Sequence, residues 1–260
     1  MNQKPNIEIL KEPKGFIKGI ELFITIFAFA TVAGFVGSFQ FKVNCQVNPQ
    51  ELLSRDVKGK FYYPFNSITL YTAADGRFCA NETETSEEYT LDMNYKSESQ
   101  YFVFTGVVSM LFVLVALVYY VLFEDRAKEA TSTDVGLFSF PVVDFVVTIV
   151  LVIFWFTSAI AWASALSGLK DATSKDKILS DHPTCANTEV TKCAWVFGAT
   201  YGAATVSVVF GFLNFFVWGG NLWFLFKETP WHSPRSSGAR GKESVPQEPP
   251  IQDTPPASAI

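Results

Sequence analysis

Four long stretches of the chain contain no charged side chain, and they constrain the fold more than any other feature. A helix needs about 20 mostly apolar residues to cross the hydrocarbon core of a bilayer, and each stretch is long enough. Because a backbone in lipid must satisfy its own hydrogen bonds, such segments cross as helices. The sequence predicts an all-α transmembrane protein; a soluble all-α protein is the alternative, but its buried apolar runs are usually shorter. The stretches are 22–41, 100–123, 145–169 and 193–226.

The cysteines indicate which loops share a side of the membrane. Cys45 and Cys79 lie between the first two predicted helices, and Cys185 and Cys193 lie between the last two. With four crossings these two loops share one side, and disulfides persist in oxidising compartments. Four cysteines allow three pairings. We expect Cys45–Cys79 and Cys185–Cys193, because each bridge closes within one loop.

Two further observations give the same orientation. A glycosylation sequon begins at Asn81, in the first cysteine loop. The N-terminal arm, the connection between helices two and three and the tail carry ten Lys and Arg, whereas the loop between helices three and four carries four. Short cytosolic segments are enriched in these residues. We therefore expect both termini in the cytosol, the cysteine loops on the lumenal or extracellular side, and a glycan on Asn81.

The chain divides into an arm, a membrane domain and a tail. Apolar residues alternate with other residues in the first cysteine loop, which predicts a small β-sheet held by the Cys45–Cys79 bridge. The fourth stretch has 34 residues, more than a bilayer core needs, so we expect its helical end at 193–197 to project into the lumenal domain. Proline concentrates in the tail, which predicts disorder. The expected segments are 1–18 (cytosolic arm), 19–228 (membrane domain, with spans at about 20–41, 101–123, 141–166 and 198–226 and lumenal loops at 42–100 and 167–197) and 229–260 (disordered cytosolic tail).

Small residues recur at helical spacing in the first and fourth predicted helices. Small side chains let helix backbones approach closely in lipid, so we expect these two helices to pack together, within one copy or between copies. The residues are Ala30, Gly34 and Ser38, and then Gly198, Gly202, Ser207 and Gly211.

Few polar residues lie within the spans. Asn214 and Asn221 are expected to form interhelical hydrogen bonds. Glu21 and Asp144 are expected at cytosolic helix ends, where water and headgroups reach them and where they cap helices or pair with Lys18 or each other. Asp144 is also a candidate for interhelical bonding.

No catalytic constellation, phosphate loop or metal-binding spacing is visible, so we expect no enzyme activity and no cofactor. The chain has only two histidines and four cysteines, and neither cysteine pair has the short spacing of a zinc site. A net charge of −5 without a basic stripe disfavours nucleic acid as a partner.

Several blocks carry a resemblance to a known family. One is Lys11-Glu12-Pro13 followed by Gly15-Phe16-Ile17-Lys18, and the most specific runs from Val206 through Asn214, Trp218 and Trp223 to Thr229. Over about residues 9–232 the chain resembles the synaptophysin and pantophysin family. Further matching blocks are Tyr63-Pro64-Phe65, Asp144-Phe145 and Ala161-Trp162-Ala163.

The resemblance implies a MARVEL-type four-helix vesicle membrane protein with cytosolic ends and bridged lumenal loops. Members oligomerise and associate with cholesterol-rich vesicle membranes, and the best known binds a vesicle SNARE protein. No Tyr follows Tyr201, and Ser164 stands where a Lys is usual. These departures favour the pantophysin or mitsugumin-like branch, or an early-branching relative, over a synaptic paralogue.

These features predict a non-enzymatic integral protein of transport or secretory vesicles that organises the membrane and partner proteins. One alternative is an oligomeric channel or transporter, which the apparent lack of buried charge disfavours. Another is a junction-type adhesion protein of claudin architecture, although the claudin Gly-Leu-Trp…Cys…Cys signature is missing.

Overall fold

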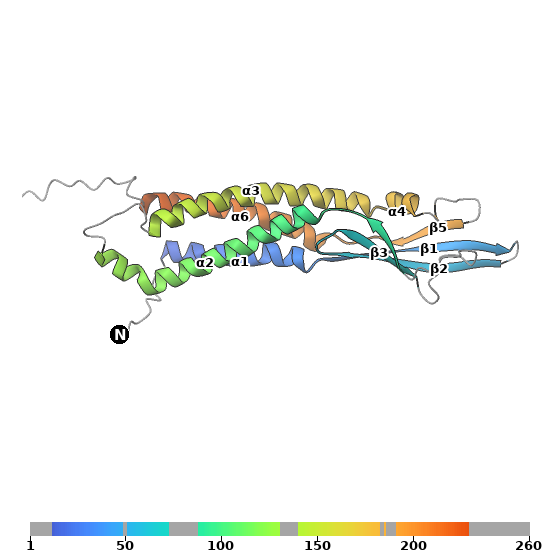
Figure 1. Cartoon of the computed structure of the whole chain (residues 1–260), viewed down its shortest axis with the longest axis horizontal. Coiled ribbons are helices and arrows are strands. Elements are labelled where there is room, and N and C mark those ends of the chain that lie inside the picture. Colours follow the sequence, from blue (N-terminus) through green and yellow to red (C-terminus); the bar gives the residue numbers. More distant parts are fainter. Residues whose placement is uncertain are drawn as a thin grey trace, which may run out of the picture.

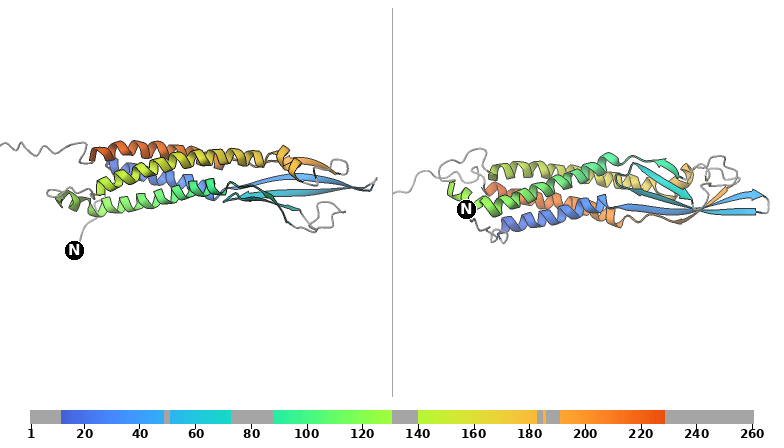
Figure 2. Two further views of the ribbon diagram at one scale, coloured as in Figure 1. Left: turned by 45° about the horizontal axis from the view of Figure 1, so that its top comes forward. Right: turned by 60° about the horizontal axis from the view of Figure 1, so that its bottom comes forward.

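The computed structural model describes residues 12–48, 51–72, 88–130, 140–182, 185 and 191–228. Four long helices lie side by side, and a five-stranded sheet continues from one end of the bundle along the same axis (Figures 1 and 2). The N-terminal arm before residue 12 and the tail after residue 228 lie outside the described residues.

The four helices confirm the predicted transmembrane class. Each is long and apolar enough to cross a membrane. Helix α1 packs against α2 and α6, and α3 packs against the same two helices, so α1 and α3 occupy diagonal corners of the bundle. The start of α1, the end of α2, the start of α3 and the end of α6 all lie at the end away from the sheet (Figure 1). The helices are α1 (Pro13–Ala33), α2 (Lys96–Ala130), α3 (Phe140–Ala172) and α6 (Gly202–Glu228).

The first helix ends earlier than the predicted span of 20–41. The N–H of Gly34 donates to the carbonyl oxygen of Ala30, and strand β1 (Val36–Asn48) begins two residues later. From Val36 onward alternate residues are buried, including Phe39 and Phe41, so the period changes from helical to two within one apolar run. An uncharged run alone does not separate a helix from a strand.

The sheet confirms the strands predicted in the first cysteine loop and adds one from the second. All neighbouring strands are antiparallel, in the order β4-β3-β2-β1-β5. The expectation that 193–197 continues a helix is wrong, because this segment is part of β5 and pairs with β1. Its Cys, Trp, Val and Phe residues suit a strand. The strands after β1 are β2 (Glu51–Tyr62), β3 (Ser67–Thr72), β4 (Glu88–Asp92) and β5 (Thr191–Phe197), and the short helix α4 (Lys175–Asp181) precedes β5.

Phenylalanine rings lie over glycines on the inner face of the sheet. Phe39 is opposite Gly59, and Gly37 is opposite Phe61. A Cβ atom on Gly59 would lie 2.2 Å from Phe39 Cζ, and one on Gly37 would lie 2.0 Å from Phe61 Cζ. No larger residue fits at either position without moving a ring, so the two pairs fix how β1 and β2 pack.

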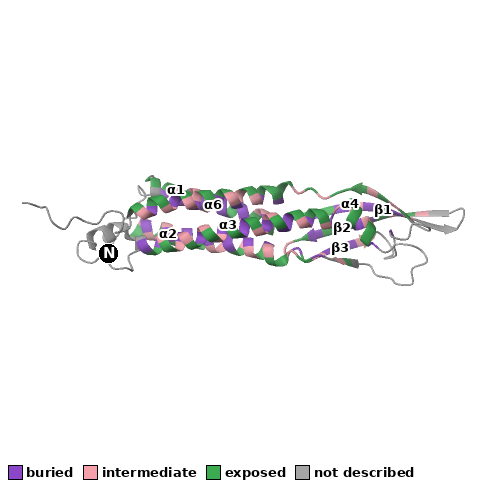
Figure 3. Ribbon diagram, turned by 90° about the horizontal axis from the view of Figure 1, so that it is seen from above, coloured by how far each residue is buried: buried purple, intermediate pink, exposed green. Residues whose placement is uncertain are grey.

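The inner face of the sheet joins the core of the bundle. Trp195 of β5 stacks on Phe39, and Phe65 stacks on Trp162 of α3. The main cluster of buried apolar residues runs from the sheet into the helices, and many large apolar side chains on the outer surface of the helices are exposed (Figure 3). The sheet is therefore packed directly onto the bundle.

Candidate functional site

Three charged side chains are buried together inside the bundle, towards the end away from the sheet. Lys18 Nζ of α1 lies 3.2 Å from Glu21 Oε2 and 3.3 Å from Asp144 Oδ1 of α3. All three side chains have no exposed surface. We call Lys18, Glu21, Asp144 and the polar residues bonded to them the buried ion cluster.

Helical spacing brings the members of the cluster to the centre of the bundle. Lys18, Glu21 and Thr25 are separated by three and four residues on α1, and Asp144 and Thr148 by four on α3. Residues at these separations share one helix face. On α1 and on α3, these polar residues therefore lie on the face that turns toward the centre of the bundle.

Neutral donors surround both carboxylates. Thr148 Oγ1 lies 3.3 Å from Asp144 Oδ1, and the Tyr120 hydroxyl of α2 donates to Asp144 Oδ2. Asn221 Nδ2 of α6 donates to Glu21 Oε1 at 2.8 Å. Each of the four helices thus contributes at least one side chain, and the Lys18 ammonium lies between the two carboxylates.

Aromatic rings and a second polar group extend the cluster toward the sheet. Lys18 Nζ lies 5.4 Å from the ring centroid of Phe112 and 5.1 Å from that of Trp218. Asn214 Oδ1 accepts from Thr25 Oγ1 at 2.8 Å and from Trp218 Nε1 at 3.3 Å. The two asparagines of α6 both bond to α1, through Thr25 and Glu21.

The cluster lies at the depth of the lipid-facing surface. Phe16, two residues before Lys18, is 62% exposed, and Trp223, two residues after Asn221, is 57% exposed. Val143, next to Asp144, also faces outward. Glu21 and Asp144 pair with Lys18, as the sequence predicted, but both carboxylates are fully buried, so the expectation that water reaches them is corrected.

Burying these charges carries a large cost unless they pair. Taking one ion out of water costs several kcal/mol in real proteins, and close pairing with hydrogen bonds offsets that cost. The sequence disfavoured a channel because no buried charge was apparent, but the structure does contain buried charges. The helical spacing of the polar residues at 18, 21 and 25, at 144 and 148, and at 214, 218 and 221 could have indicated a buried polar face. The charged residues lie close to the ends of the uncharged stretches, however, so the sequence did not place them inside the bundle.

The small residues that were expected to join α1 and α6 lie elsewhere. Ser38 is on β1, and Gly198 is in the segment between β5 and α6. Ala30, Gly34 and Gly202 are exposed, so none of them lies in a closely packed interface within one copy.

Ser207 and Gly211 face α2 and α3 instead of α1. Trp162 Nε1 of α3 donates to Ser207 Oγ at 2.8 Å. A Cβ atom on Gly211 would lie 2.7 Å from Phe102 Cε2 of α2. Gly106, which the sequence did not single out, brings α2 against α1, since its Cβ would lie 2.7 Å from Phe29 Cβ.

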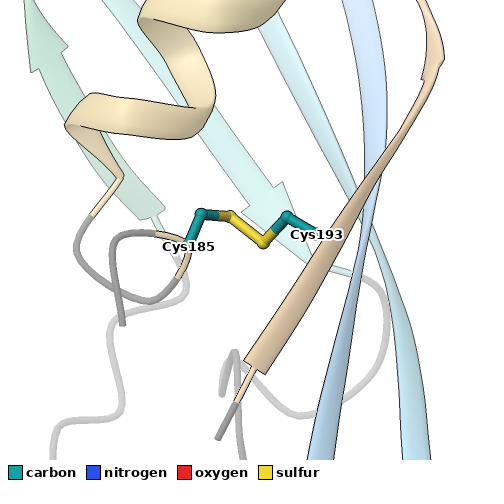
Figure 4. The surroundings of a disulfide bond; sticks show 2 residues. All are labelled: Cys185 and Cys193. Carbon is teal, nitrogen blue, oxygen red and sulfur yellow. A yellow bond between two sulfur atoms is a disulfide. The ribbon is translucent and has the colours of Figure 1, made fainter. Parts of the chain in front are cut away.

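The predicted Cys185–Cys193 bridge is present and fastens the segment after α4 to β5 (Figure 4). The Cα atoms of the two cysteines are 5.6 Å apart. Cys45 is on β1, opposite Leu53 of β2. Cys79 and Asn81 lie outside the described residues, so their predicted bridge and glycan stay predictions.

At the junction of sheet and bundle Tyr201 shares a hydrogen bond with Thr173 of the segment after α3. Burial raises the pKa of the Tyr201 hydroxyl, and the bond to Thr173 acts in the opposite direction. This hydroxyl therefore acts as a neutral hydrogen-bonding group that ties the start of α6 to the end of α3.

Comparison with known families accounts for this architecture. A family model described as MARVEL, the membrane-associating domain, matches residues 9–224. The match includes α1, α2, α3, the sheet, most of α6 and the buried ion cluster. This chain is a multi-pass membrane protein and belongs to the MARVEL family of membrane-associating domains.

Proposed function

We propose that the protein is a non-enzymatic component of transport or secretory vesicles that organises the vesicle membrane and partner proteins during trafficking or exocytosis. The MARVEL domain supports its place in a membrane, and the sequence blocks around Val206–Asn214 that resemble the synaptophysin and pantophysin family support the vesicle assignment. In this proposal the arm and tail are cytosolic and the sheet is lumenal.

One observation carries the scaffold role. Five charged and amide side chains of the spans are buried and form contacts between helices of the same copy, as in Lys18–Asp144 and Asn221–Glu21; they are Lys18, Glu21, Asp144, Asn214 and Asn221. Apolar side chains form the outward surface. Such a bundle presents its helix faces to lipid or to other membrane spans, and holds a sheet at one end that partners can reach.

The proposed partners rest on the resemblance. They are a cholesterol-containing bilayer, further copies of the chain and a vesicle SNARE protein.

Isolation of tagged vesicles tests the proposal. The full chain, tagged at its C-terminus, should sediment with small vesicles, and antibody against the tag should capture those vesicles intact. Proximity labelling from the tag should mark other vesicle membrane proteins. Accumulation at cell–cell contacts, with surface labelling of the sheet in intact cells, would favour the junction alternative.

The buried ion cluster favours a second candidate function, ion-coupled transport. Ionisable side chains at membrane depth mark ion or proton pathways by default. The observation in favour is that Glu21 and Asp144 are both within ion-pair distance of one lysine inside the bundle. Proton and monovalent-cation flux into liposomes that contain the purified protein would test it, with Asp144→Asn as the comparison.

A further inference from the structure

The base of the sheet carries an exposed apolar pair on its outer face. Val36 is 60% exposed and its register partner Tyr62 is 59% exposed. Both point away from the core side of the sheet, where Gly37 and Phe61 face inward. Exposed apolar residues just beyond a transmembrane helix raise the question of what they touch.

Contacts between helices place this pair relative to the membrane. Gly106 of α2 lies beside Phe29 of α1, and Gln100, the last exposed polar residue before the apolar surface of α2, is six residues nearer the sheet. Six residues are about 9 Å of helix. Residue 35 is the same distance from Phe29 toward the sheet, so it lies at about the level of Gln100.

Contacts between α6 and α1 place the end of the apolar surface at about the same residues of α1. Asn214 of α6 bonds to Thr25 of α1, and Thr205, an exposed polar residue of α6 at its sheet end, is nine residues from Asn214. Nine residues beyond Thr25 is Gly34. The hydrocarbon boundary on this side therefore crosses α1 at residues 34–35, and Val36 and Tyr62 lie just outside it, in the interfacial layer where tyrosine is favoured.

The next outward residue on β2 is a lysine at headgroup height. Lys60 pairs with Ser38, two residues further along the same face, which is about 7 Å of strand. The interfacial layer extends about 5–7 Å beyond each side of the core. Lys60 is exposed, and its Nζ lies 5.5 Å from the ring centroid of Tyr71. No carboxylate whose position is described lies within ion-pair distance of it.

An exposed apolar stripe runs along α1 toward the sheet, where Val36 and Tyr62 lie. Phe23, Phe27, Ala30 and Gly34 repeat at four, three and four residues on α1, and all are exposed. The stripe changes from large to small residues toward the sheet. The small side chains at Ala30 and Gly34 leave more room beside α1 at its sheet end than Phe23 and Phe27 do at its other end.

We propose that this surface binds an anionic phospholipid of the leaflet on the sheet side. The lipid phosphate pairs with Lys60, the glycerol region contacts Tyr62 and Val36, and an acyl chain lies along Ala30 and Gly34. A soluble acidic peptide would use the lysine but would not explain exposed apolar groups at the level of lipid, so the phospholipid accounts for more of the surface.

Lipid retention by the full chain tests the site. The protein is reconstituted in nanodiscs of phosphatidylcholine with phosphatidylglycerol, extracted in mild detergent, and the phosphatidylglycerol retained per protein is measured by mass spectrometry. Wild type should retain it in preference to phosphatidylcholine, and Lys60→Ala should reduce retention about fivefold, the effect of one lysine near a charged surface. Lys60→Arg should retain it, and excess inorganic phosphate should not displace it.

A lysine higher on the same face supplies the control. Lys192 of β5 pairs with Asn44 and is exposed, so Lys192→Ala removes the same charge about 20 Å further from the membrane. It should leave retention unchanged. Equal loss in Lys192→Ala and Lys60→Ala, no preference in wild type, or displacement by phosphate would overturn the proposal. Thermal unfolding in mild detergent, followed by tryptophan fluorescence, checks that each variant is folded.

Discussion

Lys18 Nζ of α1 lies 3.3 Å from Asp144 Oδ1 of α3, although these two helices occupy diagonal corners of the bundle. The lysine side chain therefore crosses the centre to a carboxylate that also accepts from Tyr120 of α2, while Asn221 of α6 donates to Glu21, the second partner of the lysine. A diagonal contact fixes all four helices at once, because neither partner can move without disturbing the two helices between them.

Lys18→Met should destabilise the bundle more than Asp144→Asn. The methionine leaves two buried carboxylates without a cation, and removal of one partner of a buried pair costs about 3–5 kcal/mol. Asp144→Asn removes one of the two acids, keeps an oxygen that accepts hydrogen bonds, and leaves Lys18 paired with Glu21. Thermal unfolding in mild detergent, followed by tryptophan fluorescence, would rank the variants.

An exposed ion pair on α4 is the matched control. Lys177 Nζ lies 3.1 Å from Asp181 Oδ2, with both side chains about half exposed. Lys177→Met should change stability by no more than about 0.5 kcal/mol, as for exposed pairs on helices. If Lys18→Met were equally mild, the buried ion cluster would have no special role in stability.

Gly211→Ala should destabilise the bundle, whereas Gly219→Ala should not. Both glycines are inside α6, so alanine gives the same gain in helix propensity at each. The new Cβ at Gly211 would lie 2.7 Å from Phe102, but nothing lies within 4 Å at Gly219. Overpacking of this kind costs about 1–3 kcal/mol. Equal unfolding temperatures for the two variants would show that α2 and α6 are not closely packed at Gly211.

The sequence was sufficient for the spans and for most of the sheet, because both produce regular patterns. It misplaced the end of α1 and the start of α6, where a strand continues an uncharged run and apolar character alone cannot separate the two structures. It identified Asn214 and Asn221, and it predicted that Glu21 and Asp144 pair with Lys18, but it did not place the two carboxylates inside the bundle. Their burial depends on which helices become diagonal neighbours, and that follows from packing across the bundle, not from any one segment.

Asn81 should carry a glycan when the protein is made in a eukaryotic secretory pathway. It follows β3 and precedes β4 in the chain, and both strands belong to the sheet that we propose is lumenal. Glycosidase should lower the mass of wild type but not that of Asn81→Gln. If the two behave alike, the sequon is unused or the sheet faces the cytosol.

Non-reducing peptide mapping should recover Cys45 linked to Cys79 in addition to the Cys185–Cys193 bridge of the structure. Closing the larger of these rings within the first loop constrains the unfolded chain and should add about 4 kcal/mol in the chain-entropy model. Cys79→Ser should therefore lower the unfolding temperature. Recovery of Cys45 linked to Cys185 would contradict the pairing and leave the topology intact.

Purified wild-type protein in a planar bilayer should give no reproducible unitary conductance. The buried ion cluster contains charge, but its cation is the ammonium of Lys18, covalently attached to α1 and held between Glu21 and Asp144. Conduction requires sites that an ion can enter and leave, and a tethered cation that fills the position between two carboxylates opposes entry of another. A clear conductance whose selectivity changes in Asn214→Ala or Asn221→Ala would contradict the scaffold role. Silence in wild type but cation current in Lys18→Ala would instead show that the lysine blocks a path that the four helices already form.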